Sequence, residues 1–141
     1  DLRDCHRKVA ALLQAMSRQP EDRVLCHNDL LRANRIFSAG RLWAVDWEYA
    51  AMASPWYDIA VVINGDSLSV LDTATLLNAY LGRAADERER DMLHQYGCIY
   101  RYLELLWYLA LDKPVLEPST IEEKSSALVN MLNGATSSRE S

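Results

Sequence analysis

Residues 25–37, LCHNDLLRANRIF, set the strongest constraint on how this chain can fold. The segment places one His, one Asp and two Asn within eight positions of an otherwise apolar stretch. Leucines follow the Asp directly, and an Ile-Phe pair comes shortly after the second Asn. Polar side chains drawn that far into an apolar region must find hydrogen-bond partners or take part in chemistry. The chain therefore has to build a polar loop between buried segments.

The first half of the chain predicts helix, hairpin and helix in turn. Apolar residues at helical spacing predict a helix over residues 2–18, which Pro20 closes. RVLC predicts a short extended run before the polar stretch. RIF and LWAV flank the Gly-containing connection SAGR, which predicts a small β-hairpin. Pro55 suits the first position of a further helix, and Asn64-Gly65 breaks that helix.

The second half predicts helices only. Ser69-x-x-Asp72 is a capping box, and Gly82 suits the C-terminal cap of the same helix. A long helix follows to about residue 111, ended by Lys113-Pro114, and a last helix stops near Gly134. Residues 135–141 are expected to be a disordered tail. The predicted fold is mainly α: residues 1–141 form a single domain, a helical bundle with a small β-hairpin beside the polar loop.

Composition excludes several classes of protein. Fifteen basic and twenty acidic residues give a net charge of −5 without a Lys/Arg cluster, which argues against a nucleic-acid partner. The three cysteines form no C-x-x-C pair, and we expect them to be reduced core residues of a cytoplasmic protein. No apolar run is long enough for a membrane span. The composition is also compatible with a homo-oligomer.

The polar stretch has the spacing of a phosphotransferase catalytic loop, His27-x-Asp29-x-x-x-x-Asn34. In that chemistry an Asp receives the proton of the substrate hydroxyl, and an Asn five residues later holds Mg²⁺. A second Mg²⁺ ligand should follow on the next hairpin, and Asp46 does so at the end of the apolar strand LWAV. Oxygen ligands of this kind suit Mg²⁺.

Two further residues are expected to support this loop. His27 would lie buried behind it and fix the turn by hydrogen bonds to the backbone, and Asp58 would be a partner for buried donors. Taken singly, each residue also allows a simpler interpretation. The stretch could be a surface loop, Asp46 a turn former, and Asp58 a helix residue that faces water. The combination of all four in order favours the catalytic interpretation.

The segment HNDLLRANRIF…LWAVDWEYAAMASPWYDIA resembles the choline/ethanolamine kinase and aminoglycoside phosphotransferase superfamily. DWEYA is most similar to the choline kinase and thiamine kinase branches, and the resemblance covers residues 24–62 closely. It implies the C-terminal lobe of a protein-kinase-like fold, with ATP as co-substrate. By the same resemblance, Asp29 would be the catalytic base, Asn34 and Asp46 the Mg²⁺ ligands, and Glu48 a support for metal or substrate.

The sequence departs from that family in two ways. Arg32 and Ala33 occupy positions where members usually carry a Pro or small residue and then Gly, which we expect to alter loop geometry slightly. Nothing in the chain resembles the Gly-rich turn or the phosphate-binding Lys of an N-terminal ATP-binding lobe. We therefore expect that lobe, from the chain's own parent protein, to be a partner, and we expect this chain alone to be inactive.

The segment YGCIYRYLELLWYL concentrates aromatic residues on one helix. Helical spacing puts Tyr96, Tyr100 and Trp107 on one face, with Tyr102 and Tyr108 elsewhere. These side chains could form an aromatic cage for a quaternary ammonium, to which Glu104 would add a negative charge. The competing interpretation is that they belong to the core.

These observations predict one lobe of an ATP- and Mg²⁺-dependent kinase that phosphorylates the hydroxyl of a small molecule, choline or a related amino alcohol. Thiamine and aminoglycosides are the alternative acceptors. A kinase-derived binding module without catalysis is the alternative from another class. Three intact candidate residues, Asp29, Asn34 and Asp46, favour the enzyme.

Overall fold

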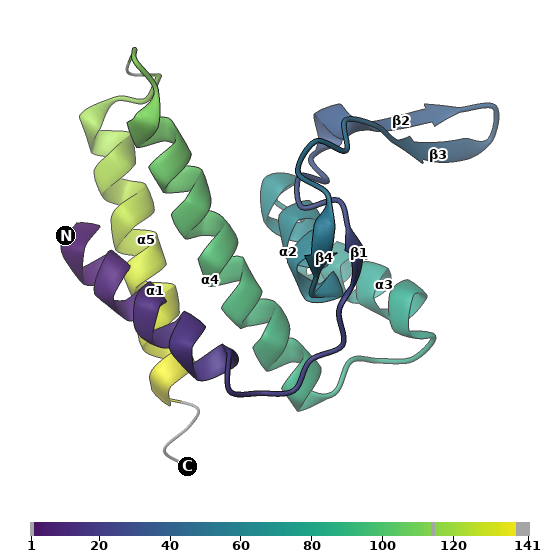
Figure 1. Ribbon diagram of the computed structural model, residues 1–141, viewed down its shortest axis with the longest axis horizontal. Helices are drawn as coiled ribbons and strands as arrows, with labels where there is room; N and C mark the ends of the chain where they lie inside the picture. Colours follow the sequence, from purple (N-terminus) through teal and green to yellow (C-terminus); the bar gives the residue numbers. More distant parts are fainter. Residues whose placement is uncertain (1, 114, 138–141) are drawn as a thin grey trace. The chain divides into compact units, whose positions relative to one another are not determined.

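A computed structural model describes residues 2–113 and 115–137 (Figure 1). Within them the fold is mainly helical, as predicted. The helices are α1 (Leu2–Met16), α2 (Pro55–Gly65), α3 (Val70–Leu81), α4 (Glu87–Ala110) and α5 (Pro118–Ser137). The strands are β1 (Val24–Cys26), β2 (Arg35–Ser38), β3 (Arg41–Ala44) and β4 (Ala51–Ala53). None of the helices in the described ranges is both long and apolar enough to cross a membrane.

The chain packs as two compact units. One is the continuous segment Glu21–Gly97, which contains all four strands, α2, α3 and the first part of α4. The other consists of α1, the part of α4 from Cys98 onward, and α5. The polar stretch predicted to carry chemistry lies wholly in the first unit.

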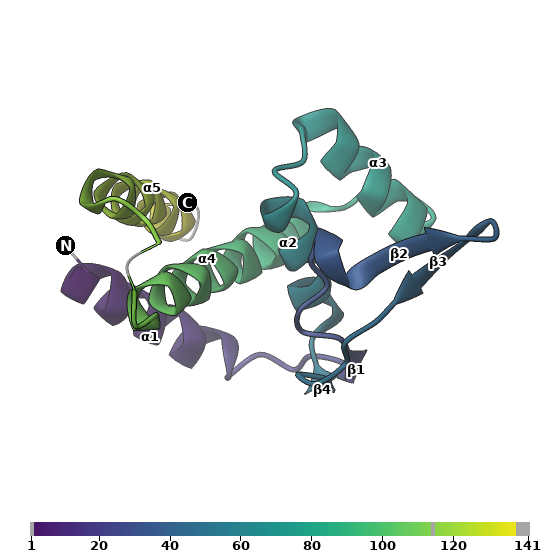
Figure 2. The same ribbon diagram turned by 90° about the horizontal axis from the view of Figure 1, so that it is seen from above.

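The predicted hairpin is present as β2 and β3, which pair antiparallel from Arg35↔Ala44 to Ser38↔Arg41 (Figure 2). The two residues between the strands, Ala39 and Gly40, have φ values of 50° and 73°. Positive φ at both central positions matches a type I′ turn, whose twist suits two-residue hairpins. Gly adopts this backbone readily, and its position in SAGR is what made the hairpin predictable.

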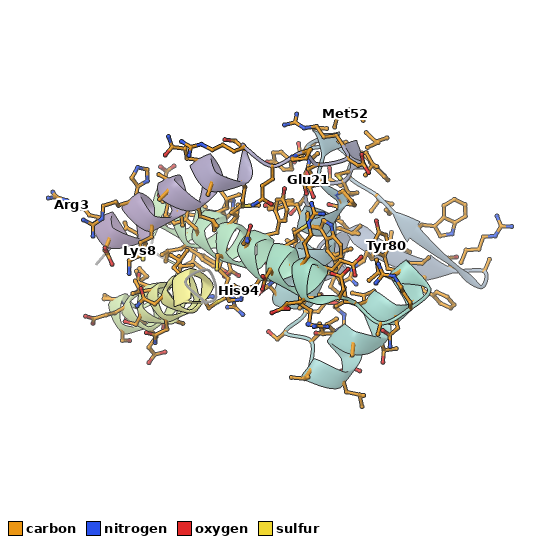
Figure 3. All side chains as sticks on the ribbon, turned by 90° about the horizontal axis from the view of Figure 1, so that it is seen from below. Arg3, Lys8, Glu21, Met52, Tyr80 and His94 are labelled. Atoms are coloured by element: carbon orange, nitrogen blue, oxygen red, sulfur yellow. The ribbon has the colours of Figure 1, made fainter. Side chains whose placement is uncertain are left out.

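A second pair of strands was not predicted. β1 pairs antiparallel with β4, with Leu25 opposite Met52, and both side chains are exposed. Figure 3 labels Met52 on β4. The sequence of β4 is Ala-Met-Ala, which has little intrinsic preference for strand, so only the pairing with β1 defines it.

The helix ends of this unit follow local capping signals. Ser54 accepts a hydrogen bond from the backbone N–H of Trp56, with Pro55 at the first helical position of α2. Ser69 accepts from the N–H of Asp72 and donates its hydroxyl to the Asp72 carboxylate, so the N-cap bond of the predicted capping box is present. Gly82 ends α3 in the left-handed conformation at φ 70°. The core beneath contains Trp56, Ile59 and Leu77.

In the other unit α1 packs along α5. Nδ1 of His6 lies 2.7 Å from the hydroxyl of Tyr102, and the thiol of Cys5 donates to the carbonyl of Ser125. Lys8, labelled in Figure 3, pairs with Asp4 at 3.3 Å. α5 continues to Ser137, three residues beyond the predicted stop at Gly134. Residues 138–141 of the predicted tail lie outside the described part of the chain.

Candidate active site

His27 lies at the start of the loop between β1 and β2, and its side chain is only 2% exposed. Its Nε2 is 2.8 Å from the carbonyl oxygen of Val45. The backbone N–H of Asp29 donates to its Nδ1 at 3.3 Å. An acceptor at Nδ1 and a carbonyl facing Nε2 together fit the neutral ring with its hydrogen on Nε2. The imidazole thus joins the loop to the end of β3.

Asp58, in the first turn of α2, binds the same loop from the other side. Its two carboxylate oxygens accept the backbone N–H groups of His27 and Asn28, at 2.7 and 2.8 Å. Asn28 has a φ of 63°, and its side-chain amide donates to the carbonyl of Tyr49 at 2.9 Å. Hydrogen bonds from N–H groups to an ionised carboxylate are stronger than neutral ones, so they can hold this unusual backbone in place.

Asp29 and Asn34 are brought together by a direct contact. The Nδ2 of Asn34 donates to the carboxylate of Asp29 and to its backbone carbonyl, both at 2.9 Å. Between them the chain forms a short 3₁₀ turn, Arg32–Asn34. Because Nδ2 makes both contacts, the side-chain oxygen of Asn34 is the atom left to act as an acceptor or metal ligand.

Asp46 lies two residues after the end of β3, and a backbone hydrogen bond connects its neighbour Val45 to Asn34. The N–H of Val45 donates to the carbonyl of Asn34 at 3.0 Å, which fixes the residue before Asp46 against the end of the loop. Asp46 itself is exposed and has a φ of 64°. A non-Gly residue in this conformation is strained, and such strain often accompanies functional sites.

The donor atoms at this end of the loop fit Mg²⁺. They are the side-chain oxygen of Asn34 and the carboxylate oxygens of Asp46, which are hard ligands. In the described ranges no three His, Cys, Asp or Glu residues gather into a protein-only metal site. Mg²⁺ is usually bound by one or two carboxylates together with substrate phosphates, and it keeps several waters.

Glu48 lies on an exposed turn directly after Asp46, closed by a hydrogen bond of 3.0 Å from the N–H of Ala50 to the carbonyl of Trp47. The ring centroids of Trp47 and His27 are 4.7 Å apart, and Nε1 of Trp47 donates to the carbonyl of Ala44 at 2.9 Å. Glu48 is therefore carried by a segment that is tied to the loop.

Tyr57 and Tyr96 form a feature that the sequence did not predict. Their rings contact edge to face with centroids 6.3 Å apart, and the Tyr96 hydroxyl donates to the carboxylate of Glu21 at 2.6 Å. Burial and the negative charges of Asp29 and Asp58 raise the pKa of Tyr57 to about 12. Burial and the bond to Glu21 raise the pKa of Tyr96 to about 12 as well. The position of Tyr57 directly before Asp58 was the available signal.

The other predicted substrate residues, Tyr100, Glu104 and Trp107, belong to the second unit, whereas Tyr96 belongs to the first. Trp107 is 60% exposed, so the core interpretation fails for this side chain, while Tyr102 is buried in agreement with it.

Side chains on α4 and α5 form a cluster around Tyr108. The rings of Trp107 and Tyr108 contact edge to face, with centroids 5.2 Å apart. The ammonium of Lys124 lies 5.6 Å from the centre of the Tyr108 ring and 3.0 Å from the carboxylate of Glu104. Tyr108 was predicted to lie off the face shared by Tyr96, Tyr100 and Trp107, and its ring contacts Trp107, the next residue back along the chain. We call Glu104, Trp107, Tyr108 and Lys124 the Tyr108 cluster.

Comparison with known families matches residues 1–105 to the model of the phosphotransferase enzyme family, APH. Among curated relatives, protein LicA of Haemophilus influenzae is 31% identical over 107 residues, which cover 72% of this chain and 32% of LicA. A LicA homolog of Metamycoplasma hominis is 31% identical over 81 residues, 57% of this chain and 31% of the homolog. The chain thus spans about a third of the length of the curated relatives it matches.

Solved structures match in fold. A choline/ethanolamine kinase family protein from Mesorhizobium loti gives a TM-score of 0.79 at 26% identity, covering 92% of this chain and 46% of that protein. The structure of LicA in complex with AMP gives a TM-score of 0.76 at 22% identity, and the match covers 94% of this chain and 47% of that one. Choline kinase LicA from Streptococcus pneumoniae gives 0.73 at 22% identity, with 94% and 48% covered. The predicted fold, the mainly helical C-terminal portion of such kinases, is confirmed.

Proposed function

Because this chain belongs to the phosphotransferase enzyme family, we propose that it carries the catalytic loop and metal ligands of an ATP-dependent kinase for a small-molecule alcohol. One observation supports this more than any other. Hydrogen bonds join Asp29 to Asn34, and Asn34 to the residue before Asp46. The proposed base and one proposed oxygen ligand thus lie in one loop, and the segment that carries the second proposed ligand, Asp46, is bonded to the end of that loop, an arrangement that suits phosphoryl transfer.

Asp29 is the proposed general base. Its carboxylate would accept the proton of the acceptor hydroxyl while that oxygen attacks the terminal phosphate. Its backbone N–H is bound by His27 and its side chain by Asn34, so the position of the carboxylate is set before substrate arrives. A preset base avoids the cost of ordering it during the reaction.

Asn34 and Asp46 are the proposed ligands of Mg²⁺. When bound, the ion would neutralise charge on the transferring phosphoryl group. His27 and Asp58 are proposed as positioning residues, because together they fix the backbone of residues 27–29 from two sides.

The proposed acceptor is choline or a related amino alcohol. The solved relatives are described as choline or choline/ethanolamine kinases, and the Tyr108 cluster has the aromatic and acidic groups that bind an ammonium. In this cluster the ring face and the Glu104 carboxylate hold the Lys124 ammonium, so an ammonium ligand would take the place of that side chain. Glu48 and Tyr96, which belong to the unit that carries the catalytic loop, remain separate proposals as substrate-binding residues.

We further propose that the active enzyme is a longer parent protein, in which an ATP-binding lobe accompanies this chain. This chain matches only about a third of the length of LicA, which supports the proposal. The AMP bound in a LicA structure supports it as well. The three buried cysteines form no disulfide within the described part of the chain, which supports a reducing compartment such as the cytoplasm.

The test is Asp29→Asn in that parent protein, with steady-state phosphotransfer and nucleotide binding both measured. We expect kcat to fall by about 10²–10⁴-fold, because a general base acts only in the transition state. ATP affinity should stay within twofold. Asp91→Asn, at an exposed position on α4, is the control and should change neither quantity. A nearly active Asp29→Asn variant would reject the catalytic-loop assignment.

A further inference from the structure

Helix α2 holds the catalytic loop at two points. Asp58 in its first turn binds the backbone at the beginning of the loop. Asp66, at the C-terminal cap of the same helix, binds Arg35, the residue directly after Asn34. One nitrogen of the guanidinium, Nη2, donates to both carboxylate oxygens of Asp66, at 2.6 and 2.5 Å. The two carboxylates are eight residues apart on one helix, a rigid spacing of about 12 Å.

Arg35 is connected through the backbone to both proposed metal ligands. It follows Asn34 in sequence and is the first residue of β2. Across the hairpin it is paired with Ala44, two residues before Asp46. A shift of Arg35 would therefore move Asn34 along the chain and the end of β3 across the ladder.

The burial of the Arg35–Asp66 ion pair indicates that it positions the backbone and adds little to the stability of the fold. The side chains of Arg35 and Asp66 are 17% and 18% exposed, so both charges are largely removed from water. In addition, Nε of Arg35 is buried and has no hydrogen-bond partner. A buried ion pair with an unsatisfied donor gains little or nothing in net stability over apolar side chains. It does fix geometry, because two charged groups have few alternative arrangements when buried.

We propose that Arg35 and Asp66 are positioning residues that set the separation of Asn34 and Asp46, and with it the affinity of this site for a divalent cation. The inference rests on the proposed function, because it takes those two residues as metal ligands. It adds a second anchor to the one that Asp58 provides, at the end of the loop where the ligands lie.

The experiment is a Mn²⁺ titration of the isotope-labelled chain, followed by NMR. Paramagnetic broadening of the Asn34 side-chain amide and the Asp46 backbone amide reports metal at this site. We expect Arg35→Met and Asp66→Asn each to weaken Mn²⁺ binding about tenfold, the lower end for residues that orient metal ligands. The double variant should bind Mn²⁺ no more weakly than either single variant, because both substitutions break the same ion pair. Exchange of the Val45 N–H, which donates to Asn34, should become faster in all three.

Arg83→Met is the matched control, since it removes a surface ion pair with Glu89 in the same unit. It should leave Mn²⁺ affinity and Val45 exchange unchanged. Unaltered Mn²⁺ affinity in Arg35→Met, or additive losses in the double variant, would overturn the inference and leave the proposed function standing. If Arg35→Met fails to fold, Asp66→Asn decides alone, because it preserves side-chain volume. Absence of broadening in the unmutated chain would reject the metal site itself, and this inference with it.

Discussion

The side-chain amide of Asn34 donates to the carboxylate of Asp29 at 2.9 Å. The same nitrogen donates to the backbone carbonyl of Asp29, so the two residues are held side chain to side chain and side chain to backbone. This contact closes the loop on itself and orients the proposed base relative to the proposed ligand. The sequence placed both residues in one motif, and the structure supplies the bond that couples them.

The chain alone should show negligible ATP-dependent phosphorylation of choline. Its sequence offers no Gly-rich turn or phosphate-binding Lys to hold the nucleotide, and positioning supplies most of the catalysis in phosphoryl transfer. A coupled assay for ADP release measures this, with Asp29→Asn as the baseline. Turnover near ordinary kinase rates, roughly 1–100 per second, would show that the chain needs no further lobe.

Asp58→Asn should destabilise the unit Glu21–Gly97. The asparagine oxygen can accept one backbone N–H, but its amino group would face the other N–H and leave it without an acceptor. We expect a loss of about 1.5–3 kcal/mol in the free energy of unfolding, the range for a hydrogen bond to a charged group. Urea denaturation measures it, and Asp22→Asn at an exposed position is the control. A change below about 0.5 kcal/mol, as for ordinary surface substitutions, would contradict this role of Asp58.

Stability should fall in alkaline solution partly through Tyr96. Its pKa is about 12 in the folded chain and 10.0 for an unperturbed tyrosine. Because the folded state holds the phenol proton more tightly, this contribution is complete below pH 10 and is lost as the pH rises toward 12. Tyr96→Phe cannot titrate, so its free energy of unfolding should decline less over that interval.

The matched control for this titration is Tyr80→Phe, at an exposed tyrosine on α3 that lies elsewhere in the same unit (Figure 3). Unfolding by denaturant at a series of pH values, with the phenolate absorbance recorded, gives both curves. Equal declines in the two variants would contradict the effect of burial and of Glu21 on Tyr96.

Trp107→Leu should weaken the preference of the parent protein for choline over its uncharged carbon analogue. An exposed cation–π contact contributes about 0.5–1 kcal/mol, so the affinity ratio should fall about two- to fivefold. Because Trp107 is 60% exposed, the melting temperature should hardly change. Calorimetric titration of both ligands measures the ratio.

Tyr80→Leu, at a similarly exposed aromatic residue, is the control for Trp107. Tyr102→Leu is unsuitable, because Tyr102 is buried and its hydroxyl lies against His6, so its loss would disturb the packing of the unit. Equal affinity of the unmutated parent for choline and its neutral analogue would end the choline hypothesis.

The features that could be predicted from the sequence are those with local causes. Ser54 and Pro55 start α2, Gly82 ends α3, and Ala39-Gly40 forms the hairpin turn, each through backbone preferences that act over a few residues. The motif from His27 to Asn34 could be found for the same reason, because its spacing lies within one loop.

The features that join distant parts of the chain depend on tertiary packing and could not be predicted. β4 exists only through its pairing with β1, Arg35 meets Asp66 31 residues away, and Tyr96 meets Glu21 across 75 residues. The Tyr108 cluster likewise depends on how α5 packs on α4. Such contacts are set by the packing of whole elements and by the burial of charge. Many sequence positions could satisfy these conditions, so local spacing does not identify the partners.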